Sequence, residues 1–207
     1  RRRGVRIDSL APRFCGEFQK GIDYIGDVEA FRENLRGHVE IAENFGYKIS
    51  VHSGSDKFRI LPCIGKECRG RFHLKTSGTS WVEAVRVIAM AEPELFRRMA
   101  GYSCQKFENA RQYYHVTANV RNVPDMREVP DADLPALMDL PDMRQVMHIT
   151  YGSLLGDCNA AGRPLFRDDI YRVLRKNKSL LGEVVSAHIR RHLQKISADA
   201  GKLFGEY

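Results

Sequence analysis

The sequence has 207 residues, of which 43% are hydrophobic and 29% charged, with a formal net charge of +7. This composition is typical of a globular protein with a real core, and no apolar run is long enough to span a bilayer, so a membrane protein is not expected. Five cysteines, an odd number scattered along the chain, argue against a disulfide framework and fit reduced thiols.

Both ends of the chain carry most of the basic clusters. The sequence begins Arg1-Arg2-Arg3-Gly4, with neither a Met nor a signal peptide, so we expect it to be part of something longer. A solvated helix face is the simplest interpretation of the basic clusters, and a site for anionic small molecules is the alternative. Cys63 and Cys68 are the one close cysteine pair, a weak zinc signal better explained as two ordinary thiols.

Strand and helix patterns alternate along the chain. The first helix pattern follows a capping Asp27 and ends at Gly46. The apolar spacing and turn residues predict four strands, at 5–14, 47–52, 71–76 and 144–150. Helices are predicted at 28–45, in a short connector around 62–70, at 81–90, 93–113 and 167–196, with a loop at 122–141.

This alternation predicts an α/β fold in which parallel strands are joined by crossover helices. Four strands cannot close an eight-stranded barrel, so the chain is either about half of a (β/α)-barrel or a small open sheet. We expect residues 1–207 to form a single domain, which under the first alternative would be one half of a TIM-barrel-like fold.

Three predicted strands each present a histidine near the C-terminal end, on the face opposite their apolar side chains. They are His52 in YKISVH, His73 in RFHLKT and His148 in RQVMHIT. A lone histidine of this kind is more often a hydrogen-bonded core residue. Three on neighbouring strands favour a divalent metal site of the zinc or manganese type.

The segments that follow two of these strands carry further polar groups. Asp56 could be a metal ligand or a proton-transfer group, or it could cap a helix beside a solvated Lys57. The loop after the third strand could hold an anion on its backbone N–H groups, or cap the next helix. Lys75, on an inner face, would need an anionic partner. His115 is ambiguous, and His38, His188 and His192 are predicted to lie on helix surfaces.

Several longer motifs resemble the tagaturonate epimerase family of bacterial hexuronate catabolism. They cover most of the chain from Leu10 to Ser153 and occur in the family's order: LAPRF, KGIDYIGD, HSGSDKF, FHLKTSGTSW, YYHV and HITYGS. The resemblance implies a barrel and a cytoplasmic, metal-dependent isomerase that interconverts D-tagaturonate and D-fructuronate. Family members are considerably longer, so this chain would correspond to their C-terminal part and could be inactive alone.

The two sugar acids differ one carbon beyond the carbon next to the ketone, where the C–H is not acidified by the carbonyl. Retro-aldol cleavage to a metal-stabilised enediolate, rotation of the aldehyde and re-addition would invert that centre. A hydride shift or an enolisation is the alternative route. We predict His52, His73 and His148 as ligands of zinc or manganese and Asp56 as the proton shuttle. Lys57 or Lys75, predicted as catalytic residues with Asp56, would pair with the substrate carboxylate, and Arg13 is a further candidate for that role. The other residues predicted to bind the substrate are Ser53, Thr76, Thr79 and His115.

Two alternatives remain. One is another metal-dependent sugar isomerase or aldolase that uses the same half-site. The other is a basic nucleic-acid-binding module, which would need aromatics interleaved with a continuous basic patch. Few aromatics lie among the terminal basic clusters, so neither nucleic acid nor a membrane is an expected partner. A half-barrel would expose its interior and sheet edges, which predicts a homo-oligomer or a missing N-terminal half that covers them.

Overall fold

The computed structural model describes residues 6–52 and 56–197, and the chain divides into two compact units. Unit 1 comprises residues 1–18, 23–76 and 189–207, and unit 2 comprises residues 19–22 and 77–188. Each has its own hydrophobic core and is described by itself. That residues 1–207 act as one domain stays a prediction.

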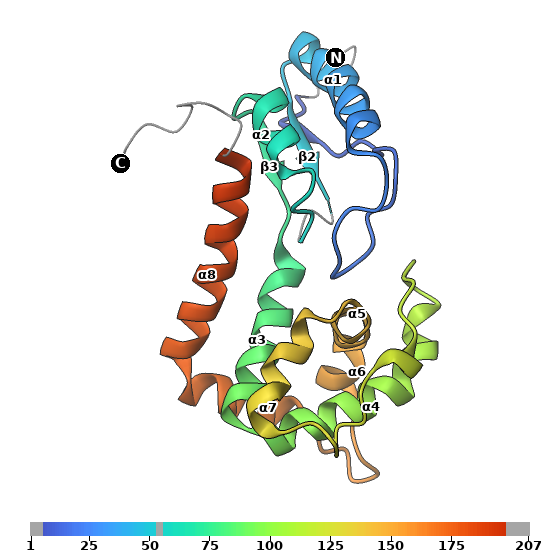
Figure 1. The fold of residues 1–207 in the computed structure, drawn as a ribbon, viewed down its shortest axis with the longest axis vertical. Helices are drawn as coiled ribbons and strands as arrows, with labels where there is room; N and C mark the ends of the chain where they lie inside the picture. The colour runs from blue at the N-terminus through green and yellow to red at the C-terminus, as the bar shows by residue number, and fades with distance from the viewer. Residues whose placement is uncertain (1–5, 53–55, 198–207) are drawn as a thin grey trace. The chain divides into compact units, whose positions relative to one another are not determined.

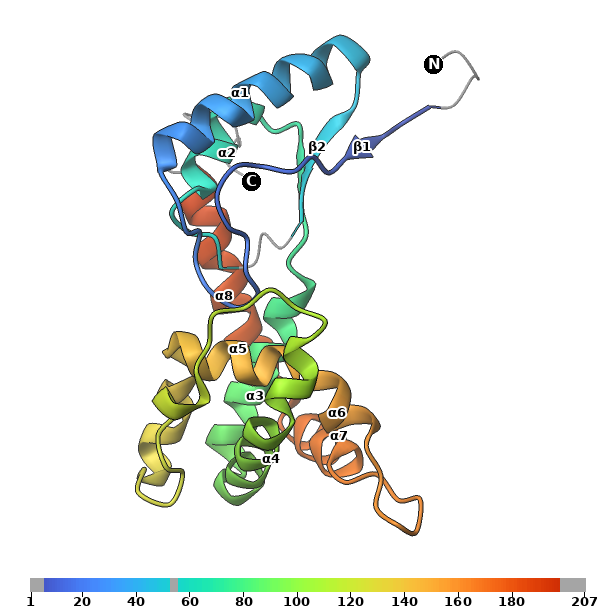
Figure 2. The same cartoon turned by 90° about the vertical axis from the view of Figure 1, so that its right-hand side faces the viewer.

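Unit 1 is built on a small parallel sheet (Figure 1). Its strands are β1 (Ser9–Leu10), β2 (Lys48–Val51) and β3 (Phe72–Leu74), in the order β1-β2-β3. The register pairs Leu10 with Ile49 and Ser50 with His73, and β1 and β2 run side by side in Figure 2. The strands predicted at 47–52 and 71–76 are therefore confirmed, whereas the first strand is much shorter than the range 5–14.

Two helices of unit 1 connect these strands, as parallel pairing requires. They are α1 (Val28–Phe45) and α2 (Leu61–Cys68). The Asp27 carboxylate accepts a hydrogen bond from the Ala30 N–H at 2.8 Å, and Gly46 ends α1 in the left-handed region with φ 73°. Both predicted ends of this helix are confirmed. The core of unit 1 is rich in aromatic and branched side chains, among them Phe14, Tyr24, Phe31, Leu35, Ile49, Val51, Ile60 and Ile64.

The two cysteines of α2 are buried in this core. Burial raises the pKa of the Cys68 thiol to about 12, and Cys63 is 2% exposed. A metal-binding cysteine is a thiolate and needs a lowered pKa. The surroundings of Cys68 favour the neutral thiol, which supports the interpretation of this pair as ordinary core thiols.

Iodoacetamide should therefore modify the exposed Cys158 long before Cys68 in the folded protein, because the thiolate is the reactive form. Peptide mass spectrometry over a time course would measure both rates. In urea the two rates should become similar, since unfolding removes the burial that raises the pKa. Equal rates in the folded protein would contradict a buried, neutral Cys68.

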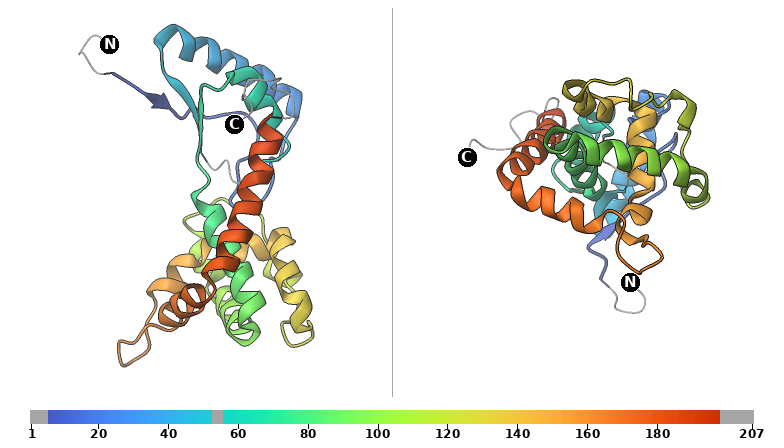
Figure 3. Two further views of the ribbon diagram at one scale, coloured as in Figure 1. Left: turned by 90° about the vertical axis from the view of Figure 1, so that its left-hand side faces the viewer. Right: turned by 90° about the horizontal axis from the view of Figure 1, so that it is seen from below.

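Unit 2 is helical in its described residues (Figure 3). Its long helices are α3 (Ser77–Ala91) and α4 (Pro93–Arg111), which confirm the helices predicted at 81–90 and 93–113. Shorter helices follow: α5 (Pro141–Ile149), α6 (Tyr151–Gly156) and α7 (Arg167–Lys176). The last helix, α8 (Lys178–Ser197), starts in unit 2 and ends in unit 1. The core joins α3, α4 and α5 through Val85, Ile88, Phe96, Met99, Met143 and Met147.

Three predictions for the second half of the chain are corrected. The strand predicted at 144–150 is wrong, because these residues belong to helix α5. The helix predicted at 167–196 is interrupted at Asn177, which separates α7 from α8. The predicted loop at 122–141 contains a long 3₁₀ helix, Asp131–Asp139, whose Leu134 and Met138 are buried.

Because the predicted fourth strand is a helix, the described residues contain three parallel strands. The α/β class is confirmed, whereas the barrel stays a prediction. Among the described residues, no helix is both long and apolar enough to cross a membrane.

Candidate functional site

The C-terminal ends of β2 and β3 carry two of the predicted metal ligands. His52 directly follows β2, and His73 lies within β3. The Ser50 hydroxyl and His73 Nδ1 are 3.0 Å apart, so these two side chains share one face of the sheet. His52, His73 and Lys75 are all exposed, which removes the desolvation cost foreseen for Lys75.

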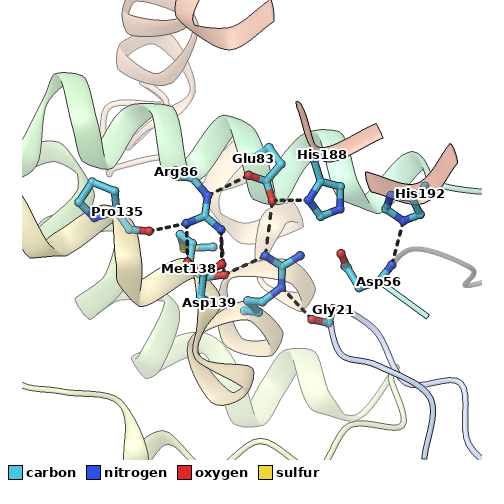
Figure 4. Close-up of polar contacts among 10 residues, drawn as sticks. Gly21, Asp56, Glu83, Arg86, Pro135, Met138, Asp139, His188 and His192 are labelled. Carbon is cyan, nitrogen blue, oxygen red and sulfur yellow. Dashed lines mark hydrogen bonds and ion pairs between the residues drawn. The ribbon is translucent and has the colours of Figure 1, made fainter. Parts of the chain in front are cut away.

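Asp56 and Lys57 lie beyond β2 and are buried. Asp56 is 6% exposed and Lys57 is 0% exposed. Asp56 adopts φ 63°, a left-handed conformation that aspartate and asparagine tolerate better than most residues. Its backbone N–H donates a hydrogen bond to Nε2 of His192 in α8 at 3.2 Å (Figure 4). The Phe58 and His192 rings pack with centroids 4.7 Å apart, which fixes the imidazole.

Asp56 and His192 form the candidate site of unit 1. Their ligand atoms lie within 4.8 Å of each other, and both residues are buried. A carboxylate and an imidazole held together away from water are donors that suit zinc or manganese. A neutral imidazole has a single lone pair, so a divalent cation bound by His192 Nε2 would take the place of the Asp56 N–H. His192 is 2% exposed, so the prediction of a surface histidine is wrong.

His188 is the candidate site residue of unit 2, and it too is only 2% exposed rather than on the surface. Its Nδ1 lies 3.2 Å from Oε1 of the buried Glu83 (Figure 4). One signal in the sequence could have drawn attention to both histidines. His188 and His192 stand four residues apart in α8, a spacing at which side chains share a helix face.

His148 lies in α5 and not on a strand, so the strand-face argument for it is wrong. Its half-buried ring packs against Gly78, where an added Cβ would overlap the imidazole. A Cβ added at Gly21 would meet the same ring at 3.4 Å, an ordinary contact, but Gly21 has φ 72°, in the left-handed region that favours glycine. Gly78 of the motif FHLKTSGTSW is thus explained by close packing against His148, and Gly21 of the motif KGIDYIGD by its backbone conformation. The role of His148 as a ligand stays a prediction.

Contacts among the described residues do not bring the remaining predicted site residues together. Arg13 in unit 1 and His115 in unit 2 are exposed, and Thr76 is half-buried. Ser53 and the side chain of Thr79 lie outside the described residues. His38, also predicted on the surface, is half-buried, and its ring meets Phe14 edge-on at 5.5 Å.

Comparison with known proteins identifies the family to which this chain belongs. Residues 1–196 match the tagaturonate epimerase family. The tagaturonate/fructuronate epimerase of Thermotoga maritima is 45% identical over 194 residues, which are 93% of this chain and 39% of that protein. Two crystal structures of the fructuronate-tagaturonate epimerase of Cohnella laeviribosi, one native and one with glycerol, are 48% identical with a TM-score of 0.91. They are matched over 94% of this chain and 40% of theirs. The chain spans about two fifths of these relatives and belongs to the tagaturonate epimerase family.

Proposed function

We propose that this chain supplies part of a metal-dependent enzyme that interconverts D-tagaturonate and D-fructuronate. The observation that carries the proposal is the buried Asp56 in the motif HSGSDKF, held against His192 in a chain of this family. A buried carboxylate beside an imidazole is suited to move a proton at a sugar hydroxyl or to bind a cation. In an exposed pair, water would screen the interaction between the carboxylate and the imidazole.

We also propose that the sheet of unit 1 is one portion of a (β/α)-barrel. Its strands are parallel, and β1 and β3 are its edges in the described residues. The relatives are more than twice as long as this chain, so further strands from the rest of such a protein would continue the sheet. In a barrel, His52 and His73 at the strand ends would lie on the face where active sites occur.

The cation would be held by Asp56 and His192, with His52, His73 and His148 retained as further candidate ligands. His52 and His73 are exposed in the described structure, so their use as ligands requires other parts of the enzyme to cover them. A divalent cation, when bound, would polarise the ketone oxygen of the substrate.

The residues of the chain would then handle the proton and the carboxylate. Asp56 would accept the proton of the hydroxyl on the inverting carbon as the neighbouring carbon–carbon bond breaks. It would return the proton after the aldehyde has turned and the bond has re-formed. Lys57, Lys75 or Arg13 would pair with the substrate carboxylate. Hydroxyl and imidazole groups of Ser53, Thr76, Thr79 and His115 would contact the sugar hydroxyls.

We expect the intact enzyme to convert D-tagaturonate to D-fructuronate, to stop after chelation and to recover with Mn²⁺ or Zn²⁺. Proton NMR in D₂O would follow both sugars and would also test the route. Retro-aldol cleavage keeps the hydrogen on the inverting carbon, whereas deprotonation of that carbon would introduce deuterium. Failure to convert tagaturonate with either metal would contradict the proposed function.

A further inference from the structure

Glu83 in α3 is a buried carboxylate that no part of the proposed reaction uses. It is 2% exposed, and it lies among basic groups from three helices of unit 2 (Figure 4). These are Arg86 in α3, Arg144 in α5 and His188 in α8. Burying a carboxylate is costly unless its oxygens receive hydrogen bonds, so the arrangement of these donors decides what Glu83 does.

The two carboxylate oxygens have different partners. Oε2 accepts a hydrogen bond from Arg86 Nε at 2.8 Å. Oε1 lies 3.2 Å from His188 Nδ1 and 3.5 Å from Arg144 Nη1. The same Arg144 nitrogen is only 2.8 Å from the Met138 carbonyl oxygen, to which it donates a better hydrogen bond. His188 is therefore the nearer of the two partners of Oε1.

This contact fixes the proton on the His188 ring. An ionised carboxylate only accepts hydrogen bonds, so the ring nitrogen facing it must carry the hydrogen. A neutral His188 with its proton on Nδ1 has its lone pair on Nε2. A buried carboxylate that sets the tautomer and angle of an imidazole in this way is the common support of metal-binding histidines.

We propose that Glu83 is a positioning residue that holds His188 in the Nδ1–H tautomer, so that His188 offers Nε2 to a divalent cation. This rests on the proposed function, which calls for a divalent cation.

The test compares Glu83→Gln and His188→Ala with the control Glu183→Gln, which changes an exposed glutamate of α8. Side-chain ¹⁵N NMR of the metal-free enzyme should show Nδ1–H at His188, and Glu83→Gln should shift it towards a mixture of tautomers. Calorimetric titration with Mn²⁺ should show binding weakened about 10- to 100-fold in Glu83→Gln, as is typical when such a support is lost. The control should bind Mn²⁺ as the unchanged enzyme does.

If the role of Glu83 is purely structural, Glu83→Gln will lower the melting temperature and leave the affinity for Mn²⁺ unchanged. That result would overturn the proposal. If Glu83→Gln does not fold, His188→Ala decides, because it leaves Glu83 paired with Arg86. Unchanged Mn²⁺ affinity in His188→Ala, or an Nε2–H tautomer in the unchanged enzyme, would also overturn it. Neither the NMR spectrum nor the Mn²⁺ titration needs substrate. Their outcome is therefore distinguishable from a failure of the unchanged enzyme to convert tagaturonate.

Discussion

Replacing Asp56 with asparagine should slow tagaturonate conversion by about 10²- to 10⁴-fold, the usual contribution of a positioned proton-transfer group. The amide keeps the size of the side chain but cannot take a proton from the substrate, and it is a weaker ligand for a cation. Asparagine also tolerates the left-handed conformation of this residue. The backbone N–H that donates to His192 is retained, so the variant should stay folded.

Steady-state rates with D-tagaturonate, together with circular dichroism, would check this expectation for Asp56. The control is Asp168→Asn, which changes an exposed carboxylate at the start of α7 and should leave the rate as it is. A folded Asp56→Asn protein with unchanged turnover would remove Asp56 from the reaction. A fall in rate that tracks lost metal content would assign Asp56 as a ligand and not as the proton shuttle.

The elements of unit 1 could be predicted because their signals are local. The cap at Asp27, the left-handed Gly46 and the β-rich run after it define α1 and β2 through neighbouring residues alone. The face shared by Ser50 and His73 also follows from the strand period of two, and the parallel register confirms it. No long-range information was needed for these features.

Helix α5 shows where local patterns become ambiguous. In RQVMHIT the apolar residues Val146, Met147 and Ile149 fit a strand, but with Met143 they also fit helical spacing. The start Pro141-Asp142 is a helix signal that the strand prediction neglected. Six of the nine residues of α5 are buried, apolar and polar alike, so the sequence shows no clean polar face by which the two periods could be told apart.

The two buried histidines of α8 escaped prediction for a different reason. Their basic neighbours Arg190 and Arg191 indicate a solvated helix, and both arginines are indeed exposed. The polar partners of the buried His188 and His192 lie more than a hundred residues earlier in the chain, at Glu83 and at the backbone of Asp56. Only their spacing of four residues pointed to a shared role, and spacing alone does not reveal burial.

Replacing Arg144 with methionine should destabilise unit 2 by about 3–5 kcal/mol, the usual cost of removing one member of a buried ionic group. The guanidinium donates from Nε to the Gly21 carbonyl at 2.9 Å and from Nη1 to that of Met138 at 2.8 Å. Methionine fills similar space but leaves these carbonyls without their donor, and each such loss costs about 1–3 kcal/mol. The negative charge of Glu83 would also lose part of its compensation.

Urea denaturation followed by the fluorescence of Trp81 would measure the effect of Arg144→Met. Trp81 is the single tryptophan of the sequence, and its indole N–H donates to the Met147 carbonyl at 2.8 Å, so its emission reports the packing of α3 on α5. The matched control is Arg121→Met, which changes an exposed arginine of unit 2 and should shift the unfolding free energy by less than about 0.5 kcal/mol. Because the Arg144 contacts are buried, the difference between the two variants should persist in high salt. Equal stability of the two variants would show that Arg144 is dispensable for the fold of unit 2.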